Sequence, residues 1–200
     1  CKKNKISYST SLWEKKSAEN FLKSKIKCDF LKIPSACNLD FDLIEILTNK
    51  FKGKIHLSLG MTKIDEVEKI VEFFIKKNRN KDLVLYSCTS TYPSDFKDIG
   101  LLDIKKLKNK FSNIIHDVGF SGHHLGIAID IAAYALGANY IERHFTLDRT
   151  WKGTDHAASL EPAGLTKLVR DLENTAKTMH EKKEMSKSEL IQRKKLKTVK

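Results

Sequence analysis

Short apolar runs alternate along the chain with longer segments in which apolar and polar residues are mixed. The short runs are typical of buried strands, because they are only a few residues long and contain many branched and aromatic side chains. Strands are predicted at residues 6–9, 30–33, 55–57, 83–86, 114–115 with 118–120, and 140–143. Helices are predicted at residues 13–23, 42–49, 63–77, 103–110, 126–136 and 159–178.

The longer segments have the spacing of amphipathic helices. The apolar side chains of residues 63–77 recur every three or four positions, so they lie on one face of a helix. They are Ile64, Val67, Ile70, Val71 and Phe74. In the last predicted helix, Ser159 is expected to be the amino-terminal cap, and Pro162 is tolerated in the first turn.

The strand–helix unit repeats six times, which predicts an α/β fold with parallel strands and helices outside. The pattern does not separate a doubly wound sheet from a barrel, but no GxGxxG sequence follows a strand, which weighs against a dinucleotide-binding fold. Polar residues cluster after the strands, as catalytic residues do in TIM barrels. They are Ser9, Thr10, Lys32, Ser35, Ser58, Ser90, Tyr92, Ser121, His123 and His144. We therefore predict an incomplete TIM (β/α)8 barrel.

The barrel is assigned to residues 1–178, and residues 179–200 are interpreted as a charged linker toward a further domain. The chain begins with Cys1 and has six of the eight strands of a closed barrel, so we interpret it as a fragment. Two strand edges would then lack their partners. On its own, the fragment is expected to be inactive and poorly folded.

Composition narrows the class of protein. Hydrophobic residues make up 40% and charged residues 31% of the chain, as in globular proteins. The net charge is +12, but the lysines are scattered, which favours a solvated surface that attracts an anionic substrate over nucleic-acid binding. No apolar run is long enough to span a membrane. Four cysteines without CxxC spacing suggest reduced thiols in a cytoplasmic protein.

Two histidines are candidate metal ligands. His123 and His144 follow successive strands, whose ends lie close together in a barrel. Two imidazoles would leave coordination positions for water or substrate. Two unrelated polar histidines would explain the same spacing. His124 and His156 are expected to play local or supporting roles.

An anion site is predicted around Lys32, because strands of a parallel sheet are normally apolar. Hydroxyls after five strands could complete it, although each alone also suits a turn or a helix cap. They belong to Thr10, Ser35, Ser58, Ser90 and Ser121. Asp155 lies in a polar loop after the last strand and could bind a sugar hydroxyl or simply form a turn.

Several segments, in this order, together resemble the sialic acid synthase family. They are KIPSACN at 32–38, SLGM at 58–61, CTSTYP at 88–93, GFSGH at 119–123, ALGA at 135–138, IERHFTLD at 141–148, TWKGTDH at 150–156 and ASLEP at 158–162. The resemblance covers nearly the whole chain. It implies barrel strands three to eight of a TIM barrel, followed in the family by a small antifreeze-protein-like domain.

The resemblance also implies chemistry. The family condenses phosphoenolpyruvate with an N-acetylmannosamine-type sugar, releases phosphate and uses a divalent metal, typically Mn²⁺, with Mg²⁺ or Co²⁺ as alternatives. By resemblance, His123 and His144 are metal ligands, and Tyr92 and Asp155 contact the sugar. The residues matched to phosphoenolpyruvate contacts are Thr10, Lys32, Ser35, Ser58, Ser90 and Ser121.

Some residues depart from the family pattern. Cys37 stands where many members have an acidic residue, and Ser90 stands where some have Asn. The sugar is therefore left open between N-acetylmannosamine, its 6-phosphate and a bacillosamine-derived sugar giving legionaminic or pseudaminic acid. A catalytically silent paralogue is the rival interpretation. The full-length enzyme is expected to be a cytoplasmic homodimer that binds neither nucleic acid nor membranes.

Overall fold

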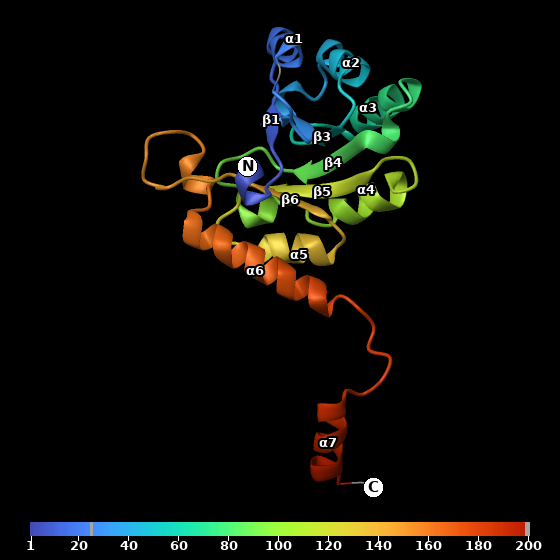
Figure 1. Cartoon of the computed structure of the whole chain (residues 1–200), viewed down its shortest axis with the longest axis vertical. Helices are drawn as coiled ribbons and strands as arrows, with labels where there is room; N and C mark the ends of the chain where they lie inside the picture. The colour runs from blue at the N-terminus through green and yellow to red at the C-terminus, as the bar shows by residue number, and fades with distance from the viewer. Residues whose placement is uncertain (25, 199–200) are drawn as a thin grey trace.

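In the computed structural model, which describes residues 1–24 and 26–198, six parallel strands form one curved sheet (Figure 1). The strands are β1 (Ser9–Ser11), β2 (Phe30–Ile33), β3 (Lys54–Ser58), β4 (Leu83–Cys88), β5 (Asp117–Gly122) and β6 (Tyr140–Arg143). The α-helices are α1 (Lys15–Lys23), α2 (Phe41–Lys50), α3 (Ile64–Lys76), α4 (Asp103–Phe111), α5 (Ala128–Ala135), α6 (Pro162–Thr178) and α7 (Lys187–Leu196). Short 3-10 helices lie at η1 (Lys2–Asn4), η2 (Ser35–Cys37), η3 (Asn80–Asp82), η4 (Phe96–Asp98) and η5 (His156–Ala158).

The strands lie in chain order, from β1 at one edge of the sheet to β6 at the other. Successive strands are connected through α1 to α5, which lie on the outside of the sheet (Figure 1). The predicted parallel α/β architecture is confirmed, and the half-barrel is consistent with an incomplete TIM-like fold. The curvature is strong enough that Lys32 of β2 approaches Glu142 of β6, across three intervening strands.

The register of the strands divides their side chains between two faces. Side chains alternate along a strand, so residues paired in register point the same way. Lys32 pairs with Ser11 and His56, and this polar row lies on the concave face. Its neighbours Leu31 and Ile33 point to the convex face, where both are fully buried.

The hydrophobic core lies between the convex face and the helices. Every strand from β2 to β5 contributes alternate apolar residues, and α2 and α3 supply the matching helix stripes. The fully buried members include Leu31, Ile33, Ile44, Leu47, Ile55, Leu57, Ile70, Phe74 and Leu85. The apolar stripe predicted for residues 63–77 is confirmed in α3, except that Ile64 is largely exposed.

Arg79 hydrogen-bonds the segment between α2 and β3, at the amino ends of the strands. The Arg79 guanidinium donates to the carbonyls of Thr48, Phe51 and Gly53, at 2.6–2.8 Å. Its Nε lies 2.5 Å from the Asp82 carboxylate. These bonds satisfy the last carbonyls of α2 and the start of β3, far from the carboxyl ends of the strands.

Three predicted boundaries were wrong. Residues 114–115 are not part of a strand, since β5 begins only at Asp117. The first strand is Ser9–Ser11 rather than residues 6–9, because pairing with β2 begins only at Ser9. Before it, the Tyr8 amide donates to the Asp29 carboxylate, and Ile6 is mostly exposed. Ser159 is not the cap of α6: its hydroxyl donates to the Asp155 carbonyl at 2.8 Å, and Glu161 occupies the cap position.

The carboxyl-terminal segment contains a helix that the sequence did not predict. α7 is capped by the Ser186 hydroxyl, which accepts from the Glu189 amide, and none of its residues is buried. Figure 1 shows it set apart from the sheet and the other helices. The predicted boundary at residue 178 coincides with the end of α6, and residues 199–200 of the predicted linker lie outside the described residues. In the described part of the chain, no helix is long and apolar enough to cross a bilayer.

Candidate functional site

A polar cavity of about 440 Å³ lies on the concave face, at the carboxyl ends of the strands. Parallel strands place their carboxyl ends at one edge, so the loops that follow them meet there. The lining residues are Ser11, Trp13, Lys32, Pro34, Ser35, Ser58, Cys88, Tyr92, Ser121, His123, Glu142, Arg143, His144, Thr154 and Asp155. Eight of the ten predicted site residues line this cavity, and the other two are Thr10 and Ser90.

Lys32 supplies a buried positive charge to the cavity. Its Nζ donates to the Ser58 hydroxyl at 2.6 Å and to the Ile33 carbonyl at 3.2 Å. It also lies 3.5 Å from Glu142 Oε1 and 5.4 Å from the centre of the Tyr86 ring. Burial lowers the pKa of Lys32, and the Glu142 carboxylate opposes that shift. The ammonium therefore has a counter-charge within the cavity.

Glu142 joins the two sides of the site. Its Oε1 accepts from the Ser121 hydroxyl at 2.8 Å and faces the Lys32 ammonium. Glu142 lies in the segment at 141–148, and no role was predicted for it from the sequence. The signal was present, because Glu142 lies two positions before His144 and strand side chains alternate with a period of two.

The imidazoles of His123 and His144 lie side by side, with ring centroids 5.1 Å apart. His123 Nδ1 donates to the Thr89 carbonyl at 2.7 Å, since a carbonyl can only accept, and this leaves Nε2 free as a ligand. Burial lowers the pKa of both rings, and for His144 the neighbouring His123 lowers it further. Both shifts favour the neutral form of the imidazole, which is the form that binds metals.

The histidine pair fits a divalent metal. A ligating histidine usually donates its second ring nitrogen to a carbonyl or carboxylate, and His123 does so. The two rings offer two nitrogen ligands, and among residues 1–24 and 26–198 no group of three or more His, Cys, Asp or Glu side chains could hold a metal. Water or substrate would therefore fill the remaining coordination positions.

Tyr92 and Asp155 lie around the histidine pair. The Tyr92 ring centroid is 4.2 Å from that of His123 and 5.6 Å from that of His144. Asp155 Oδ2 lies 3.7 Å from His144 Nδ1. A phenol and a carboxylate beside the imidazoles give this side of the cavity the groups that bind hydroxylated ligands.

The remaining predicted hydroxyls are not all equivalent. Ser35 lines the cavity, and its Oγ accepts from the Gly60 amide at 3.0 Å. Ser90 does not line the cavity; its Oγ lies 3.9 Å from Cys88 Sγ. Gly60 is required by this packing, because a Cβ there would lie 2.0 Å from the Ser90 hydroxyl.

Thr10 is the one predicted site residue on the wrong face. It pairs with Leu31, whose side chain is buried on the convex side, whereas Ser11 pairs with Lys32 and lines the cavity. A shift of one residue along a strand moves a side chain to the opposite face. The boundary of this strand was misplaced, so the sequence assigned the hydroxyl to Thr10 instead of Ser11.

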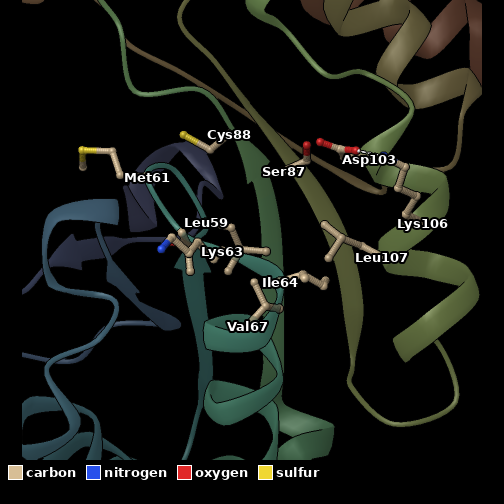
Figure 2. Close-up of a pocket in the computed structure, with 11 residues that line it drawn as sticks. Leu59, Met61, Lys63, Ile64, Val67, Ser87, Cys88, Asp103, Lys106 and Leu107 are labelled. Atoms are coloured by element: carbon tan, nitrogen blue, oxygen red, sulfur yellow. Dashed lines mark hydrogen bonds and ion pairs between the residues drawn. The ribbon is translucent and has the colours of Figure 1, made fainter.

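A larger cavity, of about 650 Å³, lies outside the sheet between α3 and α4 (Figure 2). Ile64 and Val67 of α3 face Leu107 of α4 across it, and Ser87 lies at its floor. Among the residues that the structure describes, no histidine lines it, and only Cys88 lines both cavities. The predicted site residues are therefore gathered in the smaller, concave cavity and not in this one.

Comparison with known proteins gives a consistent result. The profile of the NeuB family matches residues 1–184. The chain is 38% identical over 174 residues to the N-acetylneuraminate-9-phosphate synthase of Drosophila melanogaster, covering 87% of this chain and 45% of that protein. It is 35% identical over 190 residues to the N,N'-diacetyllegionaminic acid synthase of Campylobacter jejuni, covering 94% of this chain and 55% of that protein.

The crystal structure of the sialic acid synthetase from Leptospira borgpetersenii matches with a TM-score of 0.82 at 33% identity, covering 99% of this chain and 67% of that chain. The chain spans about half the length of the curated relatives it matches. The resemblance inferred from the motifs is confirmed. Because the matching residues run from the first strand through the last helix of the half-barrel, they include the whole lining of the concave cavity, and the chain belongs to the NeuB family of sialic acid synthases.

Proposed function

We propose that the protein containing this chain condenses phosphoenolpyruvate with an N-acetylmannosamine-type aldose to form a sialic (nonulosonic) acid and phosphate. Carbon 3 of phosphoenolpyruvate bonds to the aldehyde carbon, water adds to carbon 2, and phosphate leaves. The proposal rests on one juxtaposition: a buried ammonium and two adjacent imidazoles line the same cavity. The synthase activities named for the relatives support it.

Lys32 and the hydroxyls around it would hold phosphoenolpyruvate. Its ammonium makes one short bond, to Ser58, and a longer contact of 3.5 Å with Glu142. A phosphate or carboxylate oxygen can take over that longer contact. Ser35 and Ser121 add hydroxyl groups to the same lining, and the Ser121 hydroxyl now donates to Glu142. Fixed donors of this kind orient the enol and stabilise the charge that changes on carbon 2 and phosphate.

The histidine pair would act on the aldose. His123 and His144 would hold a divalent metal, by resemblance Mn²⁺ with Mg²⁺ or Co²⁺ as alternatives, which supplies Lewis-acid polarisation of the aldehyde carbonyl. His123 is held in one tautomer by the Thr89 carbonyl. Tyr92 and Asp155 would orient the sugar hydroxyls beside these rings.

The identity of the sugar is proposed at the level of class. Relatives include a synthase for the 9-phosphate product and one for legionaminic acid, so the candidates are N-acetylmannosamine, its 6-phosphate and a bacillosamine-derived sugar. Cys37 does not line the cavity; its thiol donates to the Trp13 carbonyl at 3.0 Å. We therefore propose no charged contact between residue 37 and the amino sugar. By the same resemblance we propose a cytoplasmic homodimer.

The test is a product assay on the full-length protein, offering each sugar with phosphoenolpyruvate and Mn²⁺. Wild type is expected to form one nonulosonic acid, and His123→Ala and His144→Ala are expected to lose bound metal and at least ~10³-fold in rate. His116→Gln is the matched control, because His116 lies outside the cavity, with its Nε2 3.3 Å from the Tyr140 hydroxyl.

Two results would contradict the proposal. Full metal content and rate in both alanine variants would show that the histidines are not the ligands. Metal binding without product from any of the three sugars would favour the silent paralogue.

A further inference from the structure

A buried charged cluster lies directly behind the site, on the convex side of β6. The Arg143 side chain is 3% exposed and Asp130 of α5 is completely buried, and Arg143 Nη1 donates to Asp130 Oδ2 at 2.5 Å. Arg143 stands between Glu142 and His144 in the chain and is itself among the residues that line the cavity. Its guanidinium, however, hydrogen-bonds to groups of His124, Gly126, Asp130 and Ala158, which lie outside that lining.

The same guanidinium bonds to both loops that complete the site. Nη2 donates to the carbonyl of His124, the residue after the predicted ligand His123, at 2.6 Å. Nη2 also lies 3.4 Å from the Ala158 carbonyl, and the Ala158 amide donates to the carbonyl of Asp155. One side chain therefore connects β6, the loop after β5 and the loop that carries Asp155.

The cluster is poorly arranged for stability alone. In the described part of the chain, three of its buried polar atoms have no hydrogen-bond partner, namely His124 Nδ1, Asp130 Oδ1 and Arg143 Nε. A buried ion pair can often be replaced by apolar residues without loss of stability. A contribution to the stability of the fold therefore does not explain the Arg143–Asp130 pair. A planar group with five fixed donors is, however, well suited to holding several backbone carbonyls in one geometry.

The strand opposite is shaped to accommodate the cluster. Gly122 of β5 is in register with Arg143. A Cβ at Gly122 would lie 3.0 Å from Asp130 Oδ1 and 2.9 Å from His124 Cε1. The missing side chain leaves room for the buried carboxylate next to the loop that carries His123.

We propose that Arg143, anchored by Asp130, is a positioning residue that sets the separation and orientation of His123 and His144. The inference rests on the proposed metal site. It predicts that the guanidinium acts on metal affinity through the backbone carbonyls that it holds. Mutation of a residue that orients the metal ligands typically weakens metal binding by about 10- to 100-fold.

The experiment compares two arginines in the full-length protein. Arg143→Lys keeps the charge but cannot span the same carbonyls, and Asp130→Asn keeps the volume but removes the anchoring charge. Arg79→Lys is the matched control, because Arg79 also bonds three carbonyls and one carboxylate, at the opposite end of the strands. The corresponding partners of Arg143 are the carbonyls of Gly126, His124 and Ala158 and the Asp130 carboxylate. Mn²⁺ binding to the metal-free proteins is measured by calorimetry, together with the melting temperature, and His144→Gln reports on the metal site itself.

Arg143→Lys and Asp130→Asn are expected to weaken Mn²⁺ binding at least 10-fold, while Arg79→Lys lowers the melting temperature with unchanged Mn²⁺ affinity. If Arg143→Lys does not fold, Asp130→Asn decides. Wild-type Mn²⁺ affinity in the folded variants, with His144→Gln defective, would overturn the positioning role and leave the proposed function intact. Wild-type Mn²⁺ affinity in His144→Gln would overturn the metal site, and the positioning role with it.

Discussion

The two faces of the sheet are made from alternate residues of the same strands, yet they have opposite character. On β2, Lys32 faces the concave cavity, while Leu31 and Ile33 are completely buried in the convex core. On β3, Ser58 accepts from Lys32, and its neighbour Leu57 belongs to the core. The contrast predicts that mutations one residue apart alter binding and stability separately.

The largest effect is expected on the convex face. Leu57→Ala should lower the free energy of unfolding by about 3–5 kcal/mol. The side chain is completely buried, so its truncation leaves a cavity in the core. Chemical denaturation measures this, and Leu102→Ala, at a residue 63% exposed, should stay within about 0.5 kcal/mol. Equal losses in both variants would contradict the division between the faces.

On the concave face, Lys32→Met keeps the aliphatic stem and removes the charge. We expect kcat/KM for phosphoenolpyruvate to fall about 10²–10³-fold, an effect typical of losing one preorganised charge contact, with much less change in KM for the sugar. Steady-state kinetics with each substrate varied in turn checks this. Lys81→Met is the control, because Lys81 is exposed and bonds the Asn113 carbonyl. Unchanged kinetics for both substrates would remove Lys32 from the site.

A pH dependence is expected from His56, which is buried on the concave face beside Lys32, its register partner on the neighbouring strand. Burial, followed by the charges of Lys32 and Lys54, lowers the pKa of His56 from 6.5 to about 4. The unfolded chain therefore binds a proton between these pH values that the folded chain does not, so the free energy of unfolding falls as the pH drops through this window, by a total on the order of 3 kcal/mol.

Denaturation curves between pH 7 and pH 4 measure this dependence. His56→Gln should flatten the slope, because its side chain does not titrate. A slope that survives in this variant would assign the dependence to other groups. The His56–Tyr86 hydrogen bond of 2.7 Å lies within the same buried cluster, so Tyr86→Phe tests whether the bond contributes.

The smallest effect concerns two adjacent hydroxyls on β1. Ser11→Ala should reduce kcat/KM for phosphoenolpyruvate roughly fivefold, which corresponds to about 1 kcal/mol. The reason is that one hydrogen-bonding group is lost from the lining. Thr10→Val should leave the kinetics unchanged, because Thr10 shares a face with Leu31. The reverse result would restore Thr10 to the site and show that the register of β1 differs from the one described.

Most of the site followed from local patterns in the sequence. Lys32, His123 and His144 stand out because polar residues at the ends of apolar strands are unusual, and alternation would have added Glu142. The choice between Thr10 and Ser11 was beyond reach, because it depends on how β1 pairs with β2, which a single sequence does not encode locally.

The role of Arg143 was hidden for a related reason. Its partners lie on α5 and in two separate loops, so only the folded arrangement brings them together. The motif around Glu142 and His144 marks the segment as unusual, but it does not say which side chain faces the cavity and which supports it from behind.

The contact between Lys32 and Glu142 has a consequence for how the protein assembles. The two residues are far apart in the sequence and lie on strands that are not neighbours, so they meet only after the intervening strands have paired and the sheet has curved. Contacts of this kind carry a high loop-closure cost and form late in folding. Partly folded chains would therefore have no anion site. A ligand bound at Lys32 would stabilise the whole sheet, because it binds the folded state alone. Its binding would then protect distant helices against unfolding and proteolysis.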